Sequence, residues 1–184
     1  QITDSGNQMI AASASAVAHP AQFYIGISPV KNVKGFPKKG DTLAYDITCI
    51  TPEGKPASEK MFAKHSELTI ELLHEDWKEV QQIGYNGEIN TRYERDMKSE
   101  NRKIVSFGSS SVKEISVNPE NGGAYLIRLS SQDSRGRDVV TETRFYATSS
   151  DFTWFNRDND SEITMTADKT MYRPGDTAHI LVQS

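Results

Sequence analysis

Several features that would assign a function at once are missing from this sequence. A single cysteine excludes an internal disulfide but does not decide the cellular compartment. No stretch approaches the roughly 20 consecutive apolar residues that a membrane-spanning helix requires. The formal net charge of -4 argues against a nucleic-acid-binding surface, because such a surface needs clustered Lys and Arg.

Motifs that carry catalytic or metal chemistry are missing too. There is no phosphate-binding glycine loop, no nucleophile elbow and no pair of catalytic carboxylates. The acidic run 158–162 lacks the spacing and the glycine of a calcium loop, and a solvated linker is expected there. The histidines lack the spacing of a zinc site and are expected to face solvent or to hydrogen bond: His19, His65, His74 and His179. We therefore expect no active site, no metal and no cofactor.

The sequence does contain short runs in which apolar and polar residues alternate. The clearest runs cover residues 41–51, 67–75, 123–131 and 139–147. This period of two is typical of half-buried β-strands, and Gly, Pro, Asn and Asp clusters separate the runs as turns. No window shows a sustained helical period. The pattern predicts an all-β fold, an immunoglobulin-like antiparallel β-sandwich.

Two motifs occur twice at nearly the same spacing. The first motif lies around Asp41 and again around Asp176. It consists of an aromatic residue, then a Pro, then Gly-Asp-Thr, and then a predicted strand. Residues 3–16 similarly resemble residues 132–147. The spacing is about the length of one sandwich domain, which indicates a fragment of a tandem array.

The repeats suggest three parts. Residues 1–19 are predicted to be the closing strand of a preceding domain. Within them the small-residue run 10–18 lacks the basic flank of a signal peptide and is interpreted as a strand. Residues 20–150 are predicted to form one complete sandwich domain. Residues 151–184 are predicted to be a linker and the first strands of the following domain.

The second copy of the Gly-Asp-Thr motif supplies the predicted domain-start turn. Pro174 begins the bend, and Gly175 can adopt the positive φ that a sharp turn requires. Asp176 can accept hydrogen bonds from backbone amides beside the bend. The preceding aromatic, Tyr172, is expected to lie over the end of the sandwich. For either copy taken alone, a generic hairpin turn is the alternative.

Together these residues resemble a known family. The run DKTMYRPGDTAHILVQS, residues 168–184, resembles the opening of the bait-region domain of bacterial α2-macroglobulins. Residues 19–29, residues 133–139 and the Trp of DFTWF (151–155) resemble the macroglobulin domain that precedes it. Residues 56–120 match only in their strand pattern.

The resemblance implies a scaffold segment of a broad-spectrum protease inhibitor and not an enzyme. In this family a protease cleaves a bait segment, and the ensuing conformational change encloses the protease. The implied partners are target proteases, reached through the full-length parent, and neighbouring macroglobulin domains. Bacterial members lie in the periplasm or cell envelope, often lipid-anchored, so a membrane contact would be an anchor outside this fragment.

The thioester of many family members is not expected in this segment. It forms in a Gly-Cys-x-Glu-Gln motif, whereas Cys49 stands in DITCITPE and lies on the apolar face of a predicted strand. We interpret Cys49 as a buried structural thiol. The bait segment is expected after Ser184.

Some segments carry more than one interpretation. Residues 90–105 and 52–67 are polar and rich in Lys and Arg, so either could be a bait-like sensor. A hairpin with outward charges is favoured for both, since edge strands commonly carry such charges. Trp154 and Phe155 fall between two predicted domains and, with Tyr172, are hypothesised to couple them.

Two other functions remain open from the residues alone. One is a cell-surface adhesion or carbohydrate-binding array of similar sandwiches, which would show exposed aromatics on a shallow platform. The other is a non-catalytic sandwich module of a secreted hydrolase.

Overall fold

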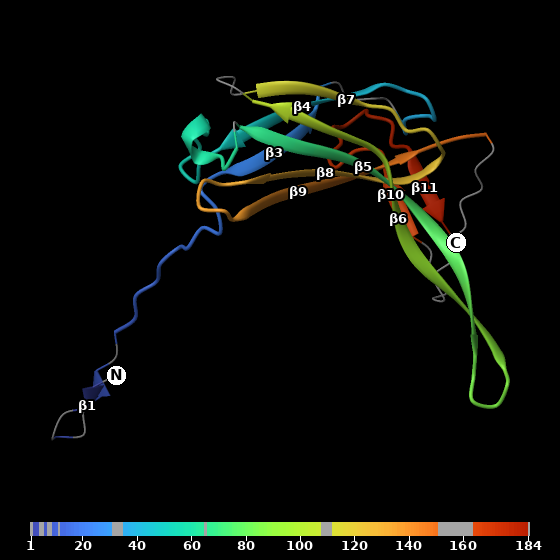
Figure 1. Ribbon diagram of the computed structural model, residues 1–184, viewed down its shortest axis with the longest axis horizontal. Coiled ribbons are helices and arrows are strands. Elements are labelled where there is room, and N and C mark those ends of the chain that lie inside the picture. The colour runs from blue at the N-terminus through green and yellow to red at the C-terminus, as the bar shows by residue number, and fades with distance from the viewer. Residues whose placement is uncertain are drawn as a thin grey trace.

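The computed structural model describes residues 2–3, 6, 9–10, 12–30, 35–64, 66–107, 112–150 and 164–183. Its elements are, in chain order, β1 (Ile2–Thr3), β2 (Met9–Ile10), β3 (Tyr24–Pro29), β4 (Leu43–Ile50), the 3-10 helix η1 (Glu59–Met61), β5 (Glu67–Ile83), β6 (Ile89–Ser106), β7 (Val112–Val117), β8 (Gly123–Gln132), β9 (Asp138–Ala147), β10 (Thr164–Ala167) and β11 (Ile180–Gln183). Figure 1 shows their arrangement. The described residues contain no α-helix.

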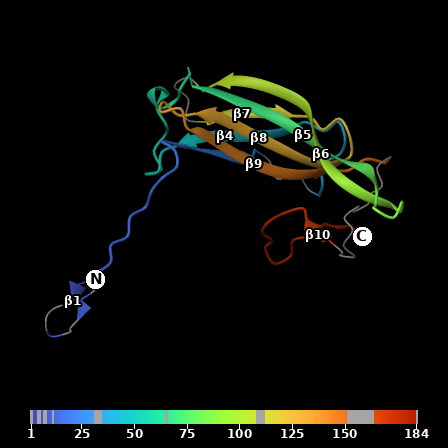
Figure 2. The ribbon, with the colours of Figure 1, turned by 60° about the horizontal axis from the view of Figure 1, so that its bottom comes forward.

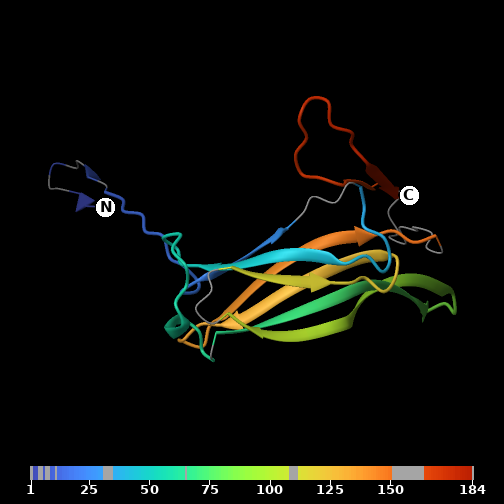
Figure 3. The same cartoon turned by 90° about the horizontal axis from the view of Figure 1, so that it is seen from above.

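Seven of these strands form two sheets that pack face to face. One sheet has the order β3-β4-β7 and the other β6-β5-β8-β9, with antiparallel pairing throughout. Figure 3 looks onto the sandwich from above, so that strands of one sheet overlap those of the other. The arrangement confirms the predicted all-β, immunoglobulin-like antiparallel sandwich.

The core lies between the sheets and is formed by the alternating residues that face inward. On β4, Leu43, Ile47 and Cys49 are buried, and the residues between them are less so. The large apolar residues that have no exposed area come from both sheets and from the segment before β3: Phe23, Ile47, Leu68, Ile127 and Leu129. This alternation is visible in the sequence, and the strands predicted over 41–51, 67–75 and 123–131 are present as β4, β5 and β8.

The two long edges of the sandwich differ. On one side β3 approaches β9, and the Thr141 hydroxyl donates a hydrogen bond of 2.7 Å to the carbonyl oxygen of Ile25. On the other side β6 and β7 are the free edges of their sheets. On this side too a side chain joins the two sheets, because Lys113 of β7 donates a hydrogen bond to the carbonyl oxygen of Ser106 at the end of β6.

The hairpin of β5 and β6 is much longer than the sandwich needs. Strand β5 pairs with β8 only over Thr69–His74, yet it pairs with β6 along its whole length. The favoured interpretation of residues 90–105 as part of a charged hairpin is confirmed. For residues 52–67 that interpretation is wrong: this segment crosses from one sheet to the other through η1, because β4 and β5 belong to different sheets.

The segment before the sandwich differs from its prediction. Strands β1 and β2 form a short antiparallel pair, and residues 12–19 are exposed and lie in no strand (Figure 2). The predicted strand over 10–18 is therefore wrong for residues 12–18. Its small Ala and Ser side chains offer little apolar area to bury against a sheet, so alternation alone does not hold them in one. The assignment of residues 1–19 to a preceding domain stays a prediction.

Candidate functional site

The two Gly-Asp-Thr motifs form two turns of the same kind. The Oδ2 atom of Asp41 accepts a hydrogen bond of 2.8 Å from the amide of Lys38. Likewise Oδ2 of Asp176 accepts one of 3.0 Å from the amide of Arg173. The glycine before each Asp has a positive φ, 83° in the first turn and 94° in the second. Each Asp thus caps a bend that only Gly adopts readily, which is why the residue pair recurs.

Asp168 organises the segment that contains the second turn. Strand β10 ends just before it, and its amide donates a hydrogen bond of 3.0 Å to the carbonyl of His179, where β11 is about to begin. Its Oδ1 atom accepts hydrogen bonds from the Tyr172 hydroxyl, at 2.6 Å, and from the amide of His179, at 3.1 Å. One carboxylate therefore closes the loop from β10 to β11.

The same carboxylate reaches the sandwich. The amide of Gly35, in the connection from β3 to β4, donates a hydrogen bond of 3.1 Å to Oδ2 of Asp168. Gly35 has φ 76°, and a Cβ placed on it would lie 3.9 Å from the imidazole of His179. Asp168 therefore joins segments that are more than a hundred residues apart in the sequence. We call Gly35, Asp168, Tyr172 and His179 the junction.

The junction is electrostatically tuned toward an ionised carboxylate. The hydroxyl of Tyr172 lowers the pKa of the Asp168 carboxyl, and the amides of His179 and Gly35 act in the same direction against the opposing effect of partial burial. The same hydrogen bond raises the pKa of the Tyr172 phenol. At neutral pH the Asp168 carboxyl is therefore ionised. Its two oxygen atoms accept hydrogen bonds from Gly35, Tyr172 and His179.

The structure places some of the residues singled out in the sequence and not others. Tyr172 is half-buried and bonded to Asp168, and Pro174, Gly175 and Asp176 form the second turn. Trp154 and Phe155 lie outside the described residues. So do His65 and the acidic run 158–162.

Sequence reasoning missed Asp168 and Gly35. Asp168 stands four residues before Tyr172 and heads the DKTMY run, so its proximity to the phenol was a usable local signal. Gly35 carried no such signal, because its contact with Asp168 depends on how two distant segments meet.

The remaining histidines have structural partners. Nδ1 of His19 lies 2.7 Å from the hydroxyl of Tyr24, and Nε2 of His74 lies 3.1 Å from the carbonyl oxygen of Gly122. Across the described parts of the chain, no group of three or more His, Cys, Asp or Glu side chains is arranged to hold a metal ion. Nor does any helix there have the length and apolar character that a membrane crossing requires.

Cys49 lies in the core on β4 and is 3% exposed. Burial raises the pKa of its thiol to about 12, so the group is protonated at neutral pH. A protonated, inaccessible thiol is neither a good nucleophile nor a metal ligand. This agrees with the interpretation of Cys49 as a structural thiol.

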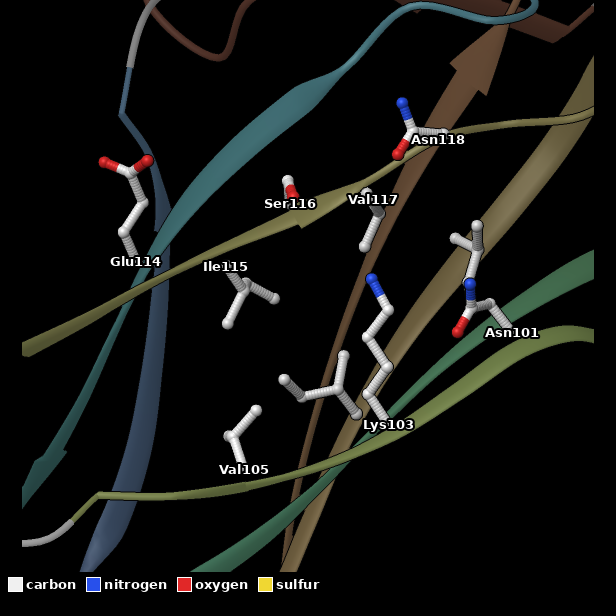
Figure 4. Close-up of a pocket in the computed structure, with 10 residues that line it drawn as sticks. Asn101, Lys103, Val105, Glu114, Ile115, Ser116, Val117 and Asn118 are labelled. Carbon is white, nitrogen blue, oxygen red and sulfur yellow. The ribbon is translucent and has the colours of Figure 1, made fainter.

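A groove lies between β6 and β7, the edge strands of the two sheets (Figure 4), with a volume of about 190 Å³. Its floor is apolar and belongs to the core, with Ile70 and Leu72 from β5 and Ile115 from β7. Lys103 extends across the opening and Glu114 stands at the far side. Because Ile70, Leu72 and Ile115 also belong to the core, the groove is an opening into the core.

Comparison with known proteins gives a consistent result. No family model matches the chain. An α2-macroglobulin homolog of Nostoc sp. (strain PCC 7120) is 23% identical over 185 residues, which cover 100% of this chain and 9% of that protein. The native conformation of E. coli α2-macroglobulin has a TM-score of 0.54 and 21% identity over 97% of this chain and 12% of its own. Salmonella α2-macroglobulin reacted with methylamine has a TM-score of 0.51 and 20% identity over 90% of this chain and 10% of its own.

The fold is thus an immunoglobulin-like sandwich with the architecture found in bacterial macroglobulins. Within that class, the sequence similarity to the Nostoc protein runs along the whole chain. The resemblance to the bacterial α2-macroglobulin family that the sequence motifs suggested is therefore confirmed. The chain spans only 9% to 12% of the length of these proteins.

Proposed function

We propose that the chain is a scaffold segment of a bacterial α2-macroglobulin-like protease inhibitor, which traps proteases after bait cleavage, and that it is not itself an enzyme. The similarity to the Nostoc homolog along the whole chain carries this proposal. The shared fold supports it. In the proposal, the bait and any thioester belong to other parts of the parent, and this segment holds the following domain in position.

The family resemblance also supplies the proposed surroundings. The parent meets target proteases, and this segment meets neighbouring macroglobulin domains. The proposed location is the periplasm or cell envelope, with any lipid anchor outside these residues.

The test uses the full-length parent and several proteases of different specificity. We expect a first cut after Ser184, located by mass spectrometry, followed by compaction on a native gel and retention of the protease. The same proteases with blocked active sites serve as the control and should cause no compaction. A first cut between Asn90 and Lys103 would move the sensor into this segment. Absence of compaction with every protease would favour an adhesion array instead.

We also propose that the junction, together with Trp154 and Phe155, couples the sandwich to the segment after it. Tyr172→Phe removes the hydroxyl that binds Asp168 and keeps the ring. Because a hydrogen bond to a carboxylate is lost, we expect the amides of Gly35 and His179 to exchange with solvent roughly tenfold faster. Exchange of these amides in the parent, followed by NMR or mass spectrometry, measures this.

Tyr24→Phe is the matched control, because the Tyr24 hydroxyl bonds to exposed His19 and not to the junction. It should leave the Gly35 and His179 amides unchanged. The coupling proposal also requires protease-triggered compaction to slow in Tyr172→Phe and in Trp154→Ala. Unchanged compaction and unchanged stability in both variants would refute it.

A further inference from the structure

A two-stranded arm projects from the sandwich. Beyond His74, the last residue of β5 that pairs with β8, Glu75–Ile83 pairs only with Ile89–Met97. Nine residues of extended chain span roughly 30 Å. Figure 1 shows this part of β5 and β6 passing beyond the ends of the other strands of the sheet. We call residues 75–97 the arm.

Ion pairs across the arm keep its two strands in register. Lys78 pairs with Asp96 and, at the base of the arm, Lys98 pairs with Asp76. Such exposed pairs each contribute little to stability. A two-stranded ribbon alone in water is at best marginally stable. At its base the arm contacts the sheet through an ion pair between Glu75 and Arg144 of β9. Beyond that point a ribbon of this length gains stability by resting against another surface.

The tip of the arm is apolar and faces solvent. Ile83 and Ile89 lie directly opposite each other and are 76% and 65% exposed. Tyr85, in the turn between them, is fully exposed. The turn is closed by the amide of Gly84, which donates a hydrogen bond of 2.7 Å to the carbonyl of Glu88. Three large apolar side chains on a closed turn form the kind of compact anchor that fills a pocket on a partner.

Charge limits the kind of partner. Acidic residues outnumber basic ones in the arm, and Glu88 lies at the tip itself. Such an arm is repelled by nucleic acid and by anionic membrane surfaces. It suits an apolar cleft on a folded protein with Lys or Arg at its rim.

We propose that the tip of the arm, Ile83, Tyr85 and Ile89, docks into an apolar, basic-rimmed cleft on another domain of the parent chain. The choice of an intramolecular partner rests on the proposed function, in which this chain is one segment of a much longer protein. The relatives it matches are long enough to supply such a domain, since the chain spans 9% to 12% of them. Docking would also shield Arg92 and Arg95 on the same arm, which are of the residue type that trypsin cleaves after.

Site-specific photo-crosslinking in the full-length parent tests the proposal. A p-benzoylphenylalanine in place of Tyr85 keeps an aromatic group at the tip, and irradiation is followed by mass spectrometry of the peptides. We expect residue 85 to link to a different domain of the same chain with no change in molecular mass. A link to a second copy, a link to a separate protein, or no link would overturn the proposal.

Substitutions separate docking from chance proximity. Ile83→Ser together with Ile89→Ser should lower the crosslink yield at residue 85 at least about tenfold, because the apolar anchor is lost. Val140→Ser, at an exposed position of β9, is the matched control and should leave the yield unchanged. An unchanged yield in the double variant would contradict docking through the tip. The crosslink does not depend on protease-triggered compaction. The docking proposal and the proposed function can therefore be refuted independently.

Discussion

Replacing Phe23 by Ala is expected to lower the free energy of unfolding by about 3–5 kcal/mol, the usual effect of removing a buried aromatic ring. Phe23 is 0% exposed, and its ring centroid lies 4.3 Å from that of Phe62. The substitution removes apolar contacts between the segment before β3 and the connection that leads to β5. It leaves a cavity that the surrounding strands cannot fill without losing their pairing.

Urea denaturation of the wild type and the variant measures this effect. Val140→Ala, on the exposed face of β9, is the control and should change the free energy of unfolding by less than about 0.5 kcal/mol. A loss below about 1 kcal/mol for Phe23→Ala would mean that this end of the sandwich is loosely packed and that Phe23 is not part of a rigid core.

The second large effect is expected at Asp133, a carboxylate that is 0% exposed. Its Oδ1 atom accepts hydrogen bonds of 3.0 Å from the amides of Arg135 and Arg137. Its Oδ2 atom accepts one of 2.8 Å from Nε of Arg137 and one of 3.1 Å from the amide of Gln22. Asp133 therefore fastens the turn between β8 and β9 to the chain that enters β3.

These donors determine how Asp133 titrates. Burial by itself raises the pKa of the carboxyl, but the amide and guanidinium of Arg137 and the amides of Arg135 and Gln22 outweigh it and hold the pKa at about 2. An unfolded Asp has a pKa of about 3.9. The folded pKa is lowered, so the stabilisation is complete above about pH 4 and is lost as the pH falls toward 2.

Asp133→Asn should therefore lower the melting temperature by about 5 °C or more at pH 7, because buried donors lose their anionic partner. The difference from the wild type should shrink as the pH is lowered from about 4 to about 2. Melting curves across this range measure both effects. Asp138→Asn, on an exposed Asp that accepts a bond from Gln132, is the control and should differ little at any pH. If the difference in melting temperature between the wild type and Asp133→Asn did not change with pH, the stabilisation would come from the shape of the side chain and not from its charge.

Much of the fold could be predicted from the sequence because the relevant physics is local. A period of two assigns the inward faces of β4 and β8 without reference to any other segment. The chemistry of Gly and Asp predicts a capped bend at Asp41 and Asp176 wherever the chain continues. The family resemblance also lay in short contiguous runs. Each of these signals is complete within one short contiguous run of the sequence.

What only the tertiary structure decided depends on pairs of distant segments. Residues 12–19 lie in no strand although a strand was predicted over 10–18. A strand also needs the edge of another strand to pair with, and the local pattern does not show whether one is available. The length of the arm follows from where β8 stops pairing with β5. The bond from Gly35 to Asp168 and the bond from Gln22 to Asp133 each join residues more than a hundred positions apart. Such contacts exist only after the sheets have packed, because a local pattern states what a segment prefers and not which segment it will meet.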